Sequence, residues 1–410
     1  MNLSETDVYN PDTYVDGIPH ELFAALRRDT PVRWIEHDGT GSWTVTSHEH
    51  IVRVNRDAKT FSSWLGTALL PEMDPEQLDQ QRMMMLNLDP PEHTKLRLIV
   101  NKAFTPRRIE ELVDRLRDRA RAIVADVAEQ GSCDFVTDVA AELPLQAIAE
   151  LLGVPQEDRH LVFDWSNRMI GAEDPEYGVT AEESGQAALE LYAYAQSLAD
   201  DKRKHPGDDI VTTLLQAEVG GERLTDLDFN LFFMLLAVAG NETTRNAIAH
   251  SMLALVEHPD ERKQLIADPA LMTPAIEEFL RWATPVMSFR RTATCDVELG
   301  GQQVHAGDRV VMWHMAGNRD EAVFDDPYRF DIDRDPNLHL TQIAFGGGGP
   351  HFCLGANLAR AEMRIMFTEL LAVLPDIELN GPVQRLRSNF INGIKHMPIG
   401  YTAIPGRAAS

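Results

Sequence analysis

The chain is poor in cysteine and has no apolar segment long enough to cross a membrane. Its three cysteines, Cys133, Cys295 and Cys353, are widely spaced and odd in number, which argues against a disulfide framework and a structural zinc site. The first residues lack the basic and apolar regions of a secretory signal, and the longest apolar run, 231–240, is too short for a spanning helix. These absences predict a cytoplasmic protein without a membrane anchor.

Basic residues are also scarce. The 38 Lys and Arg face 64 Asp and Glu, and the resulting net charge of −26 argues against nucleic acid as a partner. Residues 95–121 oppose this trend, with nine basic against four acidic side chains. This segment fits an ordinary helix face with ion pairs one turn apart, and it also fits a docking patch for an acidic protein.

Several common catalytic motifs are missing. Counting G-x-G-x-x-G from Gly346 or Gly347 puts His351 or Phe352 at the last glycine position, and no P-loop lysine follows the glycine run. The chain contains neither the G-x-S-x-G of hydrolases nor the H-E-x-x-H of metalloproteases. Phosphate binding at the glycine run and these two hydrolytic chemistries are therefore not expected.

No linker, repeat or low-complexity tract divides the chain, so we expect one domain over residues 1–410. Apolar spacings of three and four residues predict helices and dominate the pattern, while alternating runs bounded by glycine turns predict strands and a final hairpin. The fold class expected is mainly α with small β-sheets (α+β). The expected helices are 107–129, 145–152, 185–204, 226–257, 274–282 and 356–373, and the expected β segments are 42–47, 297–314 and the hairpin 390–403.

The most informative residue is Cys353, which lies between a run of four glycines, residues 346–349, and the helix expected from Ala356. Glycines allow backbone conformations that a Cβ forbids, and a helix N-terminus carries partial positive charge that favours thiolate over thiol. A thiolate is the form of cysteine that binds metals. Axial ligation of haem iron is one use of such a site.

The helix expected at 226–257 contains the polar sequence AGNETT at 239–244. One interpretation is structural, with the threonines bonding to carbonyls one turn earlier and Glu242 meeting a basic neighbour. The other is an acid and alcohol pair, Glu242 and Thr243, beside a ligand pocket, with Gly240 leaving room for a small molecule to approach. The residues alone leave both interpretations open.

Two further pairs have helical spacing. His93 and Arg97 lie one turn apart on one expected helix face, which suggests joint binding of an anion but is also common on solvated faces. Glu278 and Arg281 stand three residues apart, a spacing that is usually a surface ion pair. Neither pair is specific by itself.

These signals occur together in one order, and their combination strongly resembles the bacterial cytochrome P-450 haem-thiolate monooxygenases over essentially the whole chain. The segments LLGVPQEDR, DDIVTTLLQAE, AVAGNETTRNAI, RWATPV and FINGIKHMP resemble in particular the actinobacterial enzymes that hydroxylate terminal methyl groups of sterols and methyl-branched lipids. The chain departs from the usual family pattern at one point, because Phe345 lies eight residues before Cys353 rather than seven. The segments that carry the wider resemblance are HTKLR at 93–97, AGNETT at 239–244, EFLR at 278–281, FRRTATCD at 289–296, AGNRDEAVFDDPYRFDIDR at 316–334 and FGGGGPHFCLG at 345–355.

The resemblance implies a role for each motif. Cys353 is implied as the axial thiolate of a haem b iron, and Glu242 and Thr243 as the pair that delivers protons during activation of O2. Glu278, Arg281 and Arg334 are implied to form a buried structural charge network. Four residues are implied to contact the haem propionates, namely His93, Arg97, Arg291 and His351. The full set implied to bind the haem is His93, Arg97, Arg291, Phe345, His351, Cys353 and Gly355.

By the same resemblance, a set of nearly all apolar residues lines a substrate pocket, although ordinary core packing explains any one of them equally well. No charged residue in the set indicates a carboxylate or an amine on the substrate. A sterol, a branched lipid or fatty acid, and a terpenoid therefore stay open. The implied pocket residues are Trp64, Leu69, Met84, Met169, Met234, Val238, Ala239, Val286, Met287, Phe289 and Ile391.

The function implied is hydroxylation of a C–H bond, with electrons that come ultimately from NAD(P)H through a ferredoxin reductase and a ferredoxin. The cofactor supplies the redox chemistry, and the protein positions the substrate. Two alternatives stay open. One is a haem-thiolate sensor of gas or ligand, which would not need Glu242 and Thr243; the other is a peroxygenase or rearrangement enzyme that needs no reductant.

Overall fold

A computed structural model describes residues 7–37, 39–68, 74–170, 174–177, 180–207, 209–219, 221–335 and 337–404. Helices predominate and the sheets are small, so the fold class predicted from the sequence is confirmed. The Cα positions group into two compact units. The first comprises Met1–Lys95, Glu277–Cys353 and Arg385–Gly393, and the second comprises Leu96–Ile276, Leu354–Gln384 and Ile394–Ser410.

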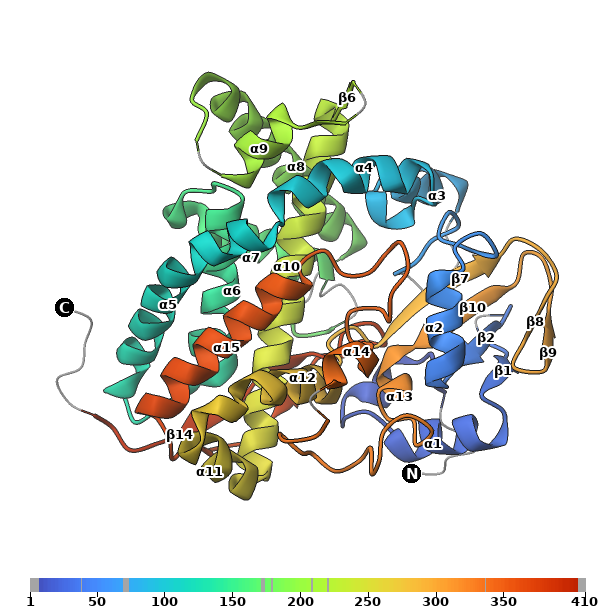
Figure 1. Ribbon diagram of the computed structural model, residues 1–410. Coiled ribbons are helices and arrows are strands. Elements are labelled where there is room, and N and C mark those ends of the chain that lie inside the picture. The colour runs from blue at the N-terminus through green and yellow to red at the C-terminus, as the bar shows by residue number, and fades with distance from the viewer. Residues whose placement is uncertain are drawn as a thin grey trace. The chain divides into compact units, whose positions relative to one another are not determined.

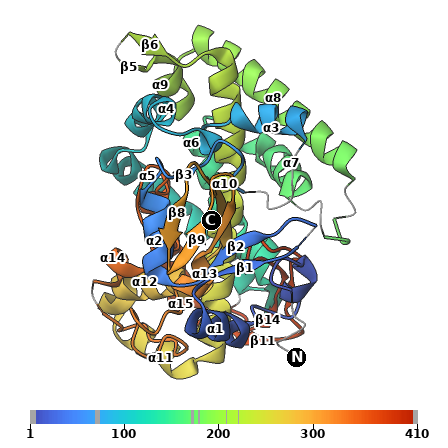
Figure 2. The same ribbon diagram turned by 90° about the vertical axis from the view of Figure 1, so that its right-hand side faces the viewer.

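The first unit holds most of the β-structure (Figures 1 and 2). Its helices are α1 (His20–Asp29), α2 (His48–Arg56), α3 (Pro75–Arg82), α13 (His314–Gly317) and α14 (Leu338–Thr341), with short 3-10 turns at Pro11–Tyr14 and Met85–Asn87. Its strands are β1 (Val32–Ile35), β2 (Ser42–Val45), β3 (Phe61–Ser62), β7 (Ser288–Ala293), β8 (Val297–Leu299), β9 (Gln302–Val304) and β10 (Arg309–Trp313).

A five-stranded sheet forms the framework of this unit, in the order β1-β2-β10-β7-β3. Its central pair is parallel and joins distant parts of the chain, with Val311 of β10 opposite Thr44 of β2. All five residues of β10 are buried, as expected for a strand with both faces covered. The apolar side chains of β10 and β2 pack with α2 in one core cluster, which includes Ile51 and Val54.

The second unit is mostly helical. Its helices are α5 (Pro106–Ala128), α6 (Glu142–Leu151), α7 (Arg159–Ile170), α8 (Ala181–Lys204), α9 (Ile210–Gln216), α10 (Asp226–Glu257), α11 (Pro259–Ala267) and α15 (Ala356–Val373), with shorter turns at Asn101–Ala103, Val136–Ala140, Gln156–Asp158 and Pro269–Leu271. Its strands are β4 (Ser132–Asp134), β5 (Glu218–Val219), β6 (Glu222–Arg223), β11 (Glu378–Leu379), β13 (Ile394–His396) and β14 (Pro398–Gly400). Three elements contain residues of both units: α4 (Glu92–Val100), α12 (Met272–Ala283) and β12 (Gln384–Arg385).

The long helix α10 is the centre of the second unit, and α6, α7, α8 and α15 all pack against it (Figure 1). It begins with a capping box, in which Thr225 and Asp228 satisfy each other's backbone N–H groups. From Phe229 onwards its side chains are buried on most sides, as expected for a helix surrounded by others. Within the described ranges, no helix is both long enough and apolar enough to span a bilayer.

The helices predicted at 107–129, 226–257 and 356–373 are confirmed to within one residue at each end. The hairpin predicted at 390–403 is wrong. Its two strands, β13 and β14, belong to different sheets, because β14 pairs with β11 and β4 whereas β13 pairs with β12. Only Met397 separates the two strands, and a hairpin turn normally needs at least two residues.

Candidate functional site

The glycine run before Cys353 adopts a backbone that other residues rarely reach. All four glycines have positive φ, from 67° at Gly347 to 108° at Gly348. At Gly349 a Cβ atom would lie 2.1 Å from the backbone oxygen of Asn55, so this position also lacks space for a side chain. The loop therefore requires glycine for conformation throughout and for packing at its last position.

The loop closes through a backbone hydrogen bond in which the Cys353 N–H donates to the Phe345 oxygen over 3.1 Å. The rings of Phe345 and Phe352 lie 6.3 Å apart between centroids. The cysteine is half-buried, and α15 begins three residues later in the chain. The position of Cys353 between the glycine run and a helix start is thus confirmed.

Two of the predicted haem residues, His93 and His351, meet in the first unit. Their ring centroids are 4.2 Å apart, and His351 Nε2 lies 3.1 Å from Ser63 Oγ. Asp89 ties this group together, because its carboxylate accepts from the Ser63 N–H over 2.8 Å and its backbone oxygen accepts from the His93 N–H over 3.0 Å. Residues more than 250 positions apart in the sequence are therefore held in one cluster.

Arg291, on β7, provides the sharpest test of whether this cluster fits an anionic group. Its side chain is buried, and its Nη1 donates to the Arg290 backbone oxygen over 2.7 Å. Burial lowers its pKa to about 10, against the opposing charge of Asp89, so the guanidinium remains charged at neutral pH. Among the described residues no carboxylate forms an ion pair with it, and a buried cation of this kind is stabilised by an anion. The haem propionates fit this requirement.

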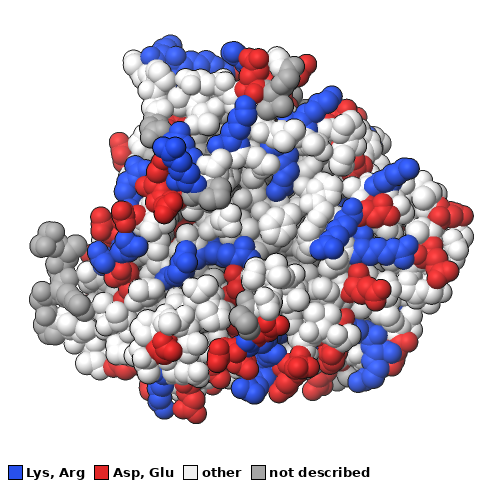
Figure 3. Space-filling model, in the orientation of Figure 1, with Lys and Arg blue, Asp and Glu red and all other residues white. Residues whose placement is uncertain are grey.

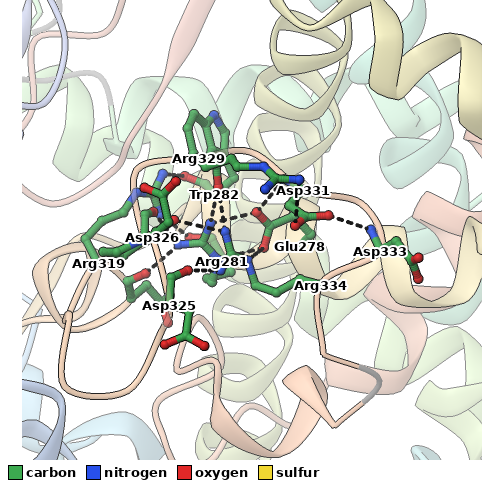
Figure 4. A network of polar contacts seen from close by, with 12 residues as sticks. Glu278, Arg281, Trp282, Arg319, Asp325, Asp326, Arg329, Asp331, Asp333 and Arg334 are labelled. Atoms are coloured by element: carbon green, nitrogen blue, oxygen red, sulfur yellow. Dashed lines mark hydrogen bonds and ion pairs between the residues drawn. The ribbon is translucent and has the colours of Figure 1, made fainter.

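The charge network implied around Glu278 and Arg281 is buried in the first unit, as the resemblance implies, and is not the surface ion pair that the spacing alone suggests (Figure 4). Both side chains are completely inaccessible, and Arg281 Nε and Nη2 donate to the two Glu278 oxygens over 2.7 and 2.6 Å. Arg334 completes the triad at 3.3 Å from Glu278. Arg281 also donates to the backbone oxygens of Asn318 and Pro327, which fixes the irregular segment before the cysteine loop.

The predicted acid, Glu242, lies in the buried centre of α10 and forms an ion pair with Arg245 one turn later. Arg245 Nη1 also donates to Asn167 on α7 over 3.2 Å. Burial raises the pKa of Glu242, and the charge and hydrogen bond of Arg245 oppose that effect. The basic neighbour expected by the structural interpretation is therefore present.

Thr243 donates its hydroxyl to the Ala239 oxygen over 2.6 Å, as the structural interpretation also expects. It is only partly buried and Ala239 is exposed, although most of their neighbours on α10 are buried. The expectation that Gly240 leaves room for a ligand is wrong. A Cβ at Gly240 would lie 2.9 Å from Cδ1 of Ile148, so the glycine instead permits close packing against α6.

The other predicted residues are distributed over both units. Arg97 is half-buried on α4, and Gly355 is the N-cap residue of α15. In the first unit, Val286 pairs with Ile391 in an isolated β-bridge, and Met287 packs in an apolar core cluster. Three more predicted pocket residues of that unit are described: Trp64 is exposed, Met84 is half-buried, and Phe289 lies on β7. Leu69 lies outside the described residues. The second unit holds Met169, Met234, Val238 and Ala239.

Three residues important to these clusters were missed at the sequence level. Ser63 and Asp89 organise His351 and His93. The hydrogen bond between Asp89 and His93 is local, but the contacts of Ser63 with Asp89 and His351 join distant parts of the chain, and nothing in the sequence around Ser63 marks it. Arg245 could have been found, since its position three residues after Glu242 places it on the same helix face.

The basic segment 95–121 consists largely of paired charges. Figure 3 shows acidic and basic side chains side by side on the part of the surface where α5 lies in Figure 1. The pairing expected for an ordinary helix face is thus present. The pairs are Lys95–Glu92, Arg107–Glu111, Arg108–Glu111, Arg115–Glu150, Arg117–Asp114, Arg119–Glu150, Arg121–Asp118 and Arg121–Glu369.

Known proteins resemble this chain over nearly its whole length. The family model for cytochrome P450 matches residues 181–374. The steroid C26-monooxygenase of Rhodococcus jostii is 48% identical over 417 residues, which cover 99% of this chain and 87% of that protein. The chain belongs to the cytochrome P450 family. A methyl-branched lipid omega-hydroxylase of Mycobacterium tuberculosis is 41% identical to this cytochrome P450 over 398 residues, covering 94% of this chain and 92% of the relative.

The fold comparison leads to the same family. A cytochrome P450 of Mycobacterium marinum, solved in complex with pseudoionone, superposes on this P450 with a TM-score of 0.89 and 40% identity, covering 97% of this chain and 98% of the other. The protein is accordingly a monooxygenase that acts with thiolate-ligated haem iron, O2 and redox partners. Bound haem supplies the redox chemistry, and the protein supplies binding and orientation.

Proposed function

We propose that this cytochrome P450 hydroxylates a terminal methyl group of a long apolar substrate, such as a sterol, a branched lipid or fatty acid, or a terpenoid. The observation that carries the proposal is the 48% identity, over 99% of the chain, to a steroid C26-monooxygenase. The 41% identity to a methyl-branched lipid omega-hydroxylase adds support for attack at a chain end. The apolar character of the proposed pocket residues is consistent with both substrate classes.

The haem residues keep the roles implied by the sequence. Cys353 is proposed as the axial ligand, Phe345 and Gly355 as neighbours of the haem, and His93, Arg97, Arg291 and His351 as partners of its propionates. The buried charge of Arg291 is the physical support for the propionate assignment, because a carboxylate relieves the cost of burying a guanidinium.

Glu242 and Thr243 are proposed as the proton-delivering pair. Burial raises the pKa of Glu242, so its carboxyl group keeps its proton to a higher pH than an ordinary surface glutamate does. The Thr243 hydroxyl donates its hydrogen to the Ala239 oxygen, so its oxygen is left to accept a hydrogen bond and to orient a protonated group in the site.

Ferredoxin and ferredoxin reductase are proposed as the electron source, and NAD(P)H as the ultimate donor. The candidate dock is the basic segment 95–121, whose exposed ion pairs are individually weak and easily exchanged for acidic partners. Turnover that falls as salt concentration rises, in step with a rising KM for ferredoxin, tests this dock. We also propose that residues 1–410 form one functional domain. The protein is proposed to be cytoplasmic, which cell fractionation tests.

The deciding experiment is a difference spectrum of the dithionite-reduced protein with carbon monoxide. We expect the red-shifted Soret band of thiolate ligation in the wild type and in the matched control Cys133→Ser, and its loss in Cys353→His. The same preparation is then titrated with sterols, branched fatty acids and terpenoids, and the spin shift and the hydroxylated carbon are recorded. A haem-loaded wild type without this band would refute the thiolate assignment; binding without hydroxylation at a chain end would refute the substrate proposal.

Thr243→Ala separates a monooxygenase from a sensor that happens to carry the same motif. Removing the hydroxyl should leave substrate binding intact and raise severalfold the share of NAD(P)H electrons that end as hydrogen peroxide. Thr243→Ser, which restores a hydroxyl, should restore most of the coupling. Equal coupling in all three proteins would mean that the threonine serves only the helix.

A further inference from the structure

The strongest unassigned feature is the attachment of the N-terminal segment, residues 7–14, to the loop 387–392. The side chains that join them act across 375 and 380 positions of sequence, so no local pattern predicts the contact. Both segments belong to the first unit, which also holds the proposed pocket residues that the loop contains or contacts. These are Val286, Met287, Phe289 and Ile391.

On one side the loop pairs with residues 283–289, which run from the end of α12 into β7. The Asn392 N–H donates to the Pro285 oxygen over 2.9 Å, and the Met287 N–H donates to the Phe390 oxygen over 2.8 Å. The isolated β-bridge described above lies between these two hydrogen bonds. The backbone of the proposed pocket residues therefore follows any displacement of the loop.

Side chains also fix the loop from within. Ser388 Oγ accepts from the N–H groups of Phe390 and Ile391 over 3.1 and 3.0 Å. Asn392 Nδ2 donates to the Ala283 oxygen over 2.6 Å. Because the two N–H groups share the Ser388 hydroxyl, the start of the loop sets the position of Ile391.

The N-terminal segment holds the start of this loop at two points. Asn389 Nδ2 donates to the Tyr9 backbone oxygen over 2.6 Å. Arg387 binds both oxygens of Asp12, with Nε 2.5 Å from Oδ1 and Nη2 3.3 Å from Oδ2. A guanidinium that binds a carboxylate through two nitrogens fixes direction as well as distance.

The N-terminal segment is itself firmly fixed to the first unit. The hydroxyl groups of Tyr9 and Thr44 on β2 lie 2.6 Å apart, and the Tyr14 hydroxyl donates to the Val8 oxygen over 2.6 Å. Val8, Tyr9 and Tyr14 are buried in the same apolar cluster as Met287. The segment therefore provides a fixed reference point for the loop.

The ion pair contributes little to overall stability. The Asp12 side chain is 62% exposed and that of Arg387 is 29% exposed, and exposed ion pairs stabilise a fold only weakly. The hydrogen bond from Arg387 lowers the pKa of Asp12, so both partners are charged at neutral pH. Breaking the pair should therefore leave the fold intact and change only how tightly the loop is held.

We propose that Asp12, Arg387 and Asn389 are positioning residues for substrate selectivity. Together they form a brace that fixes the loop from outside the proposed pocket, without touching the substrate. With the loop fixed, the pocket wall at Ile391 presents one carbon of the substrate for hydroxylation. With the brace broken, several carbons are presented. This consequence for selectivity rests on the proposed function, whereas the brace itself does not.

Hydrogen exchange of the full-length holoenzyme tests the brace without substrate. The readout is the protection factor of the Met287 and Asn392 amides, whose hydrogen bonds join the loop to its neighbour. Asp12→Asn and Arg387→Gln should each lower it about two- to fivefold, as expected for an exposed ion pair. Asn389→Ala should lower it about two- to tenfold, as expected for one lost hydrogen bond.

A double variant and a matched control make this test decisive. Asp12→Asn combined with Arg387→Gln should lower protection no further than Arg387→Gln alone, because the pair is already broken. Asp296→Asn removes an exposed carboxylate that pairs with His305 beside the β8–β9 hairpin, and it should retain wild-type protection. The denaturant midpoints of all these variants should stay close to that of the wild type. Unchanged protection, strictly additive losses in the double variant, or an equal loss in Asp296→Asn would overturn the proposal.

The selectivity of hydroxylation is the second readout, with cholesterol as the probe. In Arg387→Gln and Asn389→Ala, the share of product hydroxylated away from the terminal methyl groups of the side chain should rise about two- to fivefold. Asp12→Arg combined with Arg387→Asp restores opposite charges and should return this share towards the wild-type value.

The two readouts separate failure of the brace from failure of the proposed function. Lower protection with an unchanged product share would overturn the positioning role. A wild type that hydroxylates no terminal methyl group of cholesterol or of the other compounds titrated above would refute the proposed function, and the exchange experiment would still decide whether the brace holds the loop.

Discussion

Glu362 is a carboxyl group buried in α15 whose Oε2 has no hydrogen-bond partner among the described residues. Burial raises its pKa to about 8, so the folded protein keeps it neutral at pH 7. The unfolded chain releases this proton near pH 4.5, and between these two values the folded state therefore binds one proton more than the unfolded state. The contribution of Glu362 to stability therefore becomes less favourable as the pH rises across this window.

Glu362→Gln should remove that loss. The free energy of unfolding of the variant, relative to wild type, should increase by about 1.4 kcal/mol for each pH unit between roughly pH 5 and pH 8. Denaturant titrations of both proteins across this range measure the difference, in which all other titrating groups cancel. A constant difference would show that the carboxyl group is ionised and paired in the folded protein.

At the scale of single residues, the sequence indicated which residues are functionally unusual better than it indicated which residues contact one another. Cys353, Glu242 and Thr243 stand out because a nucleophile after a glycine run and polar groups in an apolar helix are locally unusual. The contact of His93 with His351 is different. Asp89 is local to His93, but Ser63 and His351 come from distant segments, and no local pattern contains that information.

Among the structural elements, the glycine loop before Cys353 restricts its own sequence most strictly. Gly346 and Gly349 both have positive φ, but a Cβ at Gly346 has nothing within 4 Å whereas one at Gly349 meets the Asn55 backbone. Gly346→Ala should therefore cost about 1–2 kcal/mol of stability from backbone strain alone. Gly349→Ala should cost more, because the backbone of α2 must move as well.

Thermal unfolding and haem content of the two alanine variants check this difference. The larger loss of both is expected in Gly349→Ala, and the milder Gly346→Ala serves as the control for backbone strain. Equal losses would mean that the loop relaxes away from Asn55 without cost.

Helices with long apolar stripes, such as α5, α10 and α15, were predictable because every turn repeats the signal. Short helices such as α2 and α11 were not predictable from the sequence. Helix α11, for example, buries only Arg262 and Leu265, and its other residues are largely exposed and polar or charged. The false hairpin at the C-terminal end has the same origin: strand-like residues in β13 and β14 give no indication of which strand each will pair with.

At the scale of the whole molecule, the main question is whether the two units unfold together. We expect one cooperative transition, in line with the proposal of a single domain over residues 1–410. The tryptophans allow a clean test, because five of the six lie in the first unit and only Trp165 lies in the second, whereas most helical residues lie in the second. Fluorescence and far-ultraviolet circular dichroism should therefore give coincident denaturant curves, and separated midpoints would contradict a single domain.

The parallel pairing of β2 with β10 has a consequence for how the protein is made. Val45 is added to the growing chain 267 residues before its partner Met312, which at about 5–20 residues per second is roughly 13 to 53 seconds. During that interval one edge of β2 has no strand beside it, and an open edge pairs readily with other chains. The five-stranded sheet can therefore be completed only after β10, its last strand in the sequence, has been translated.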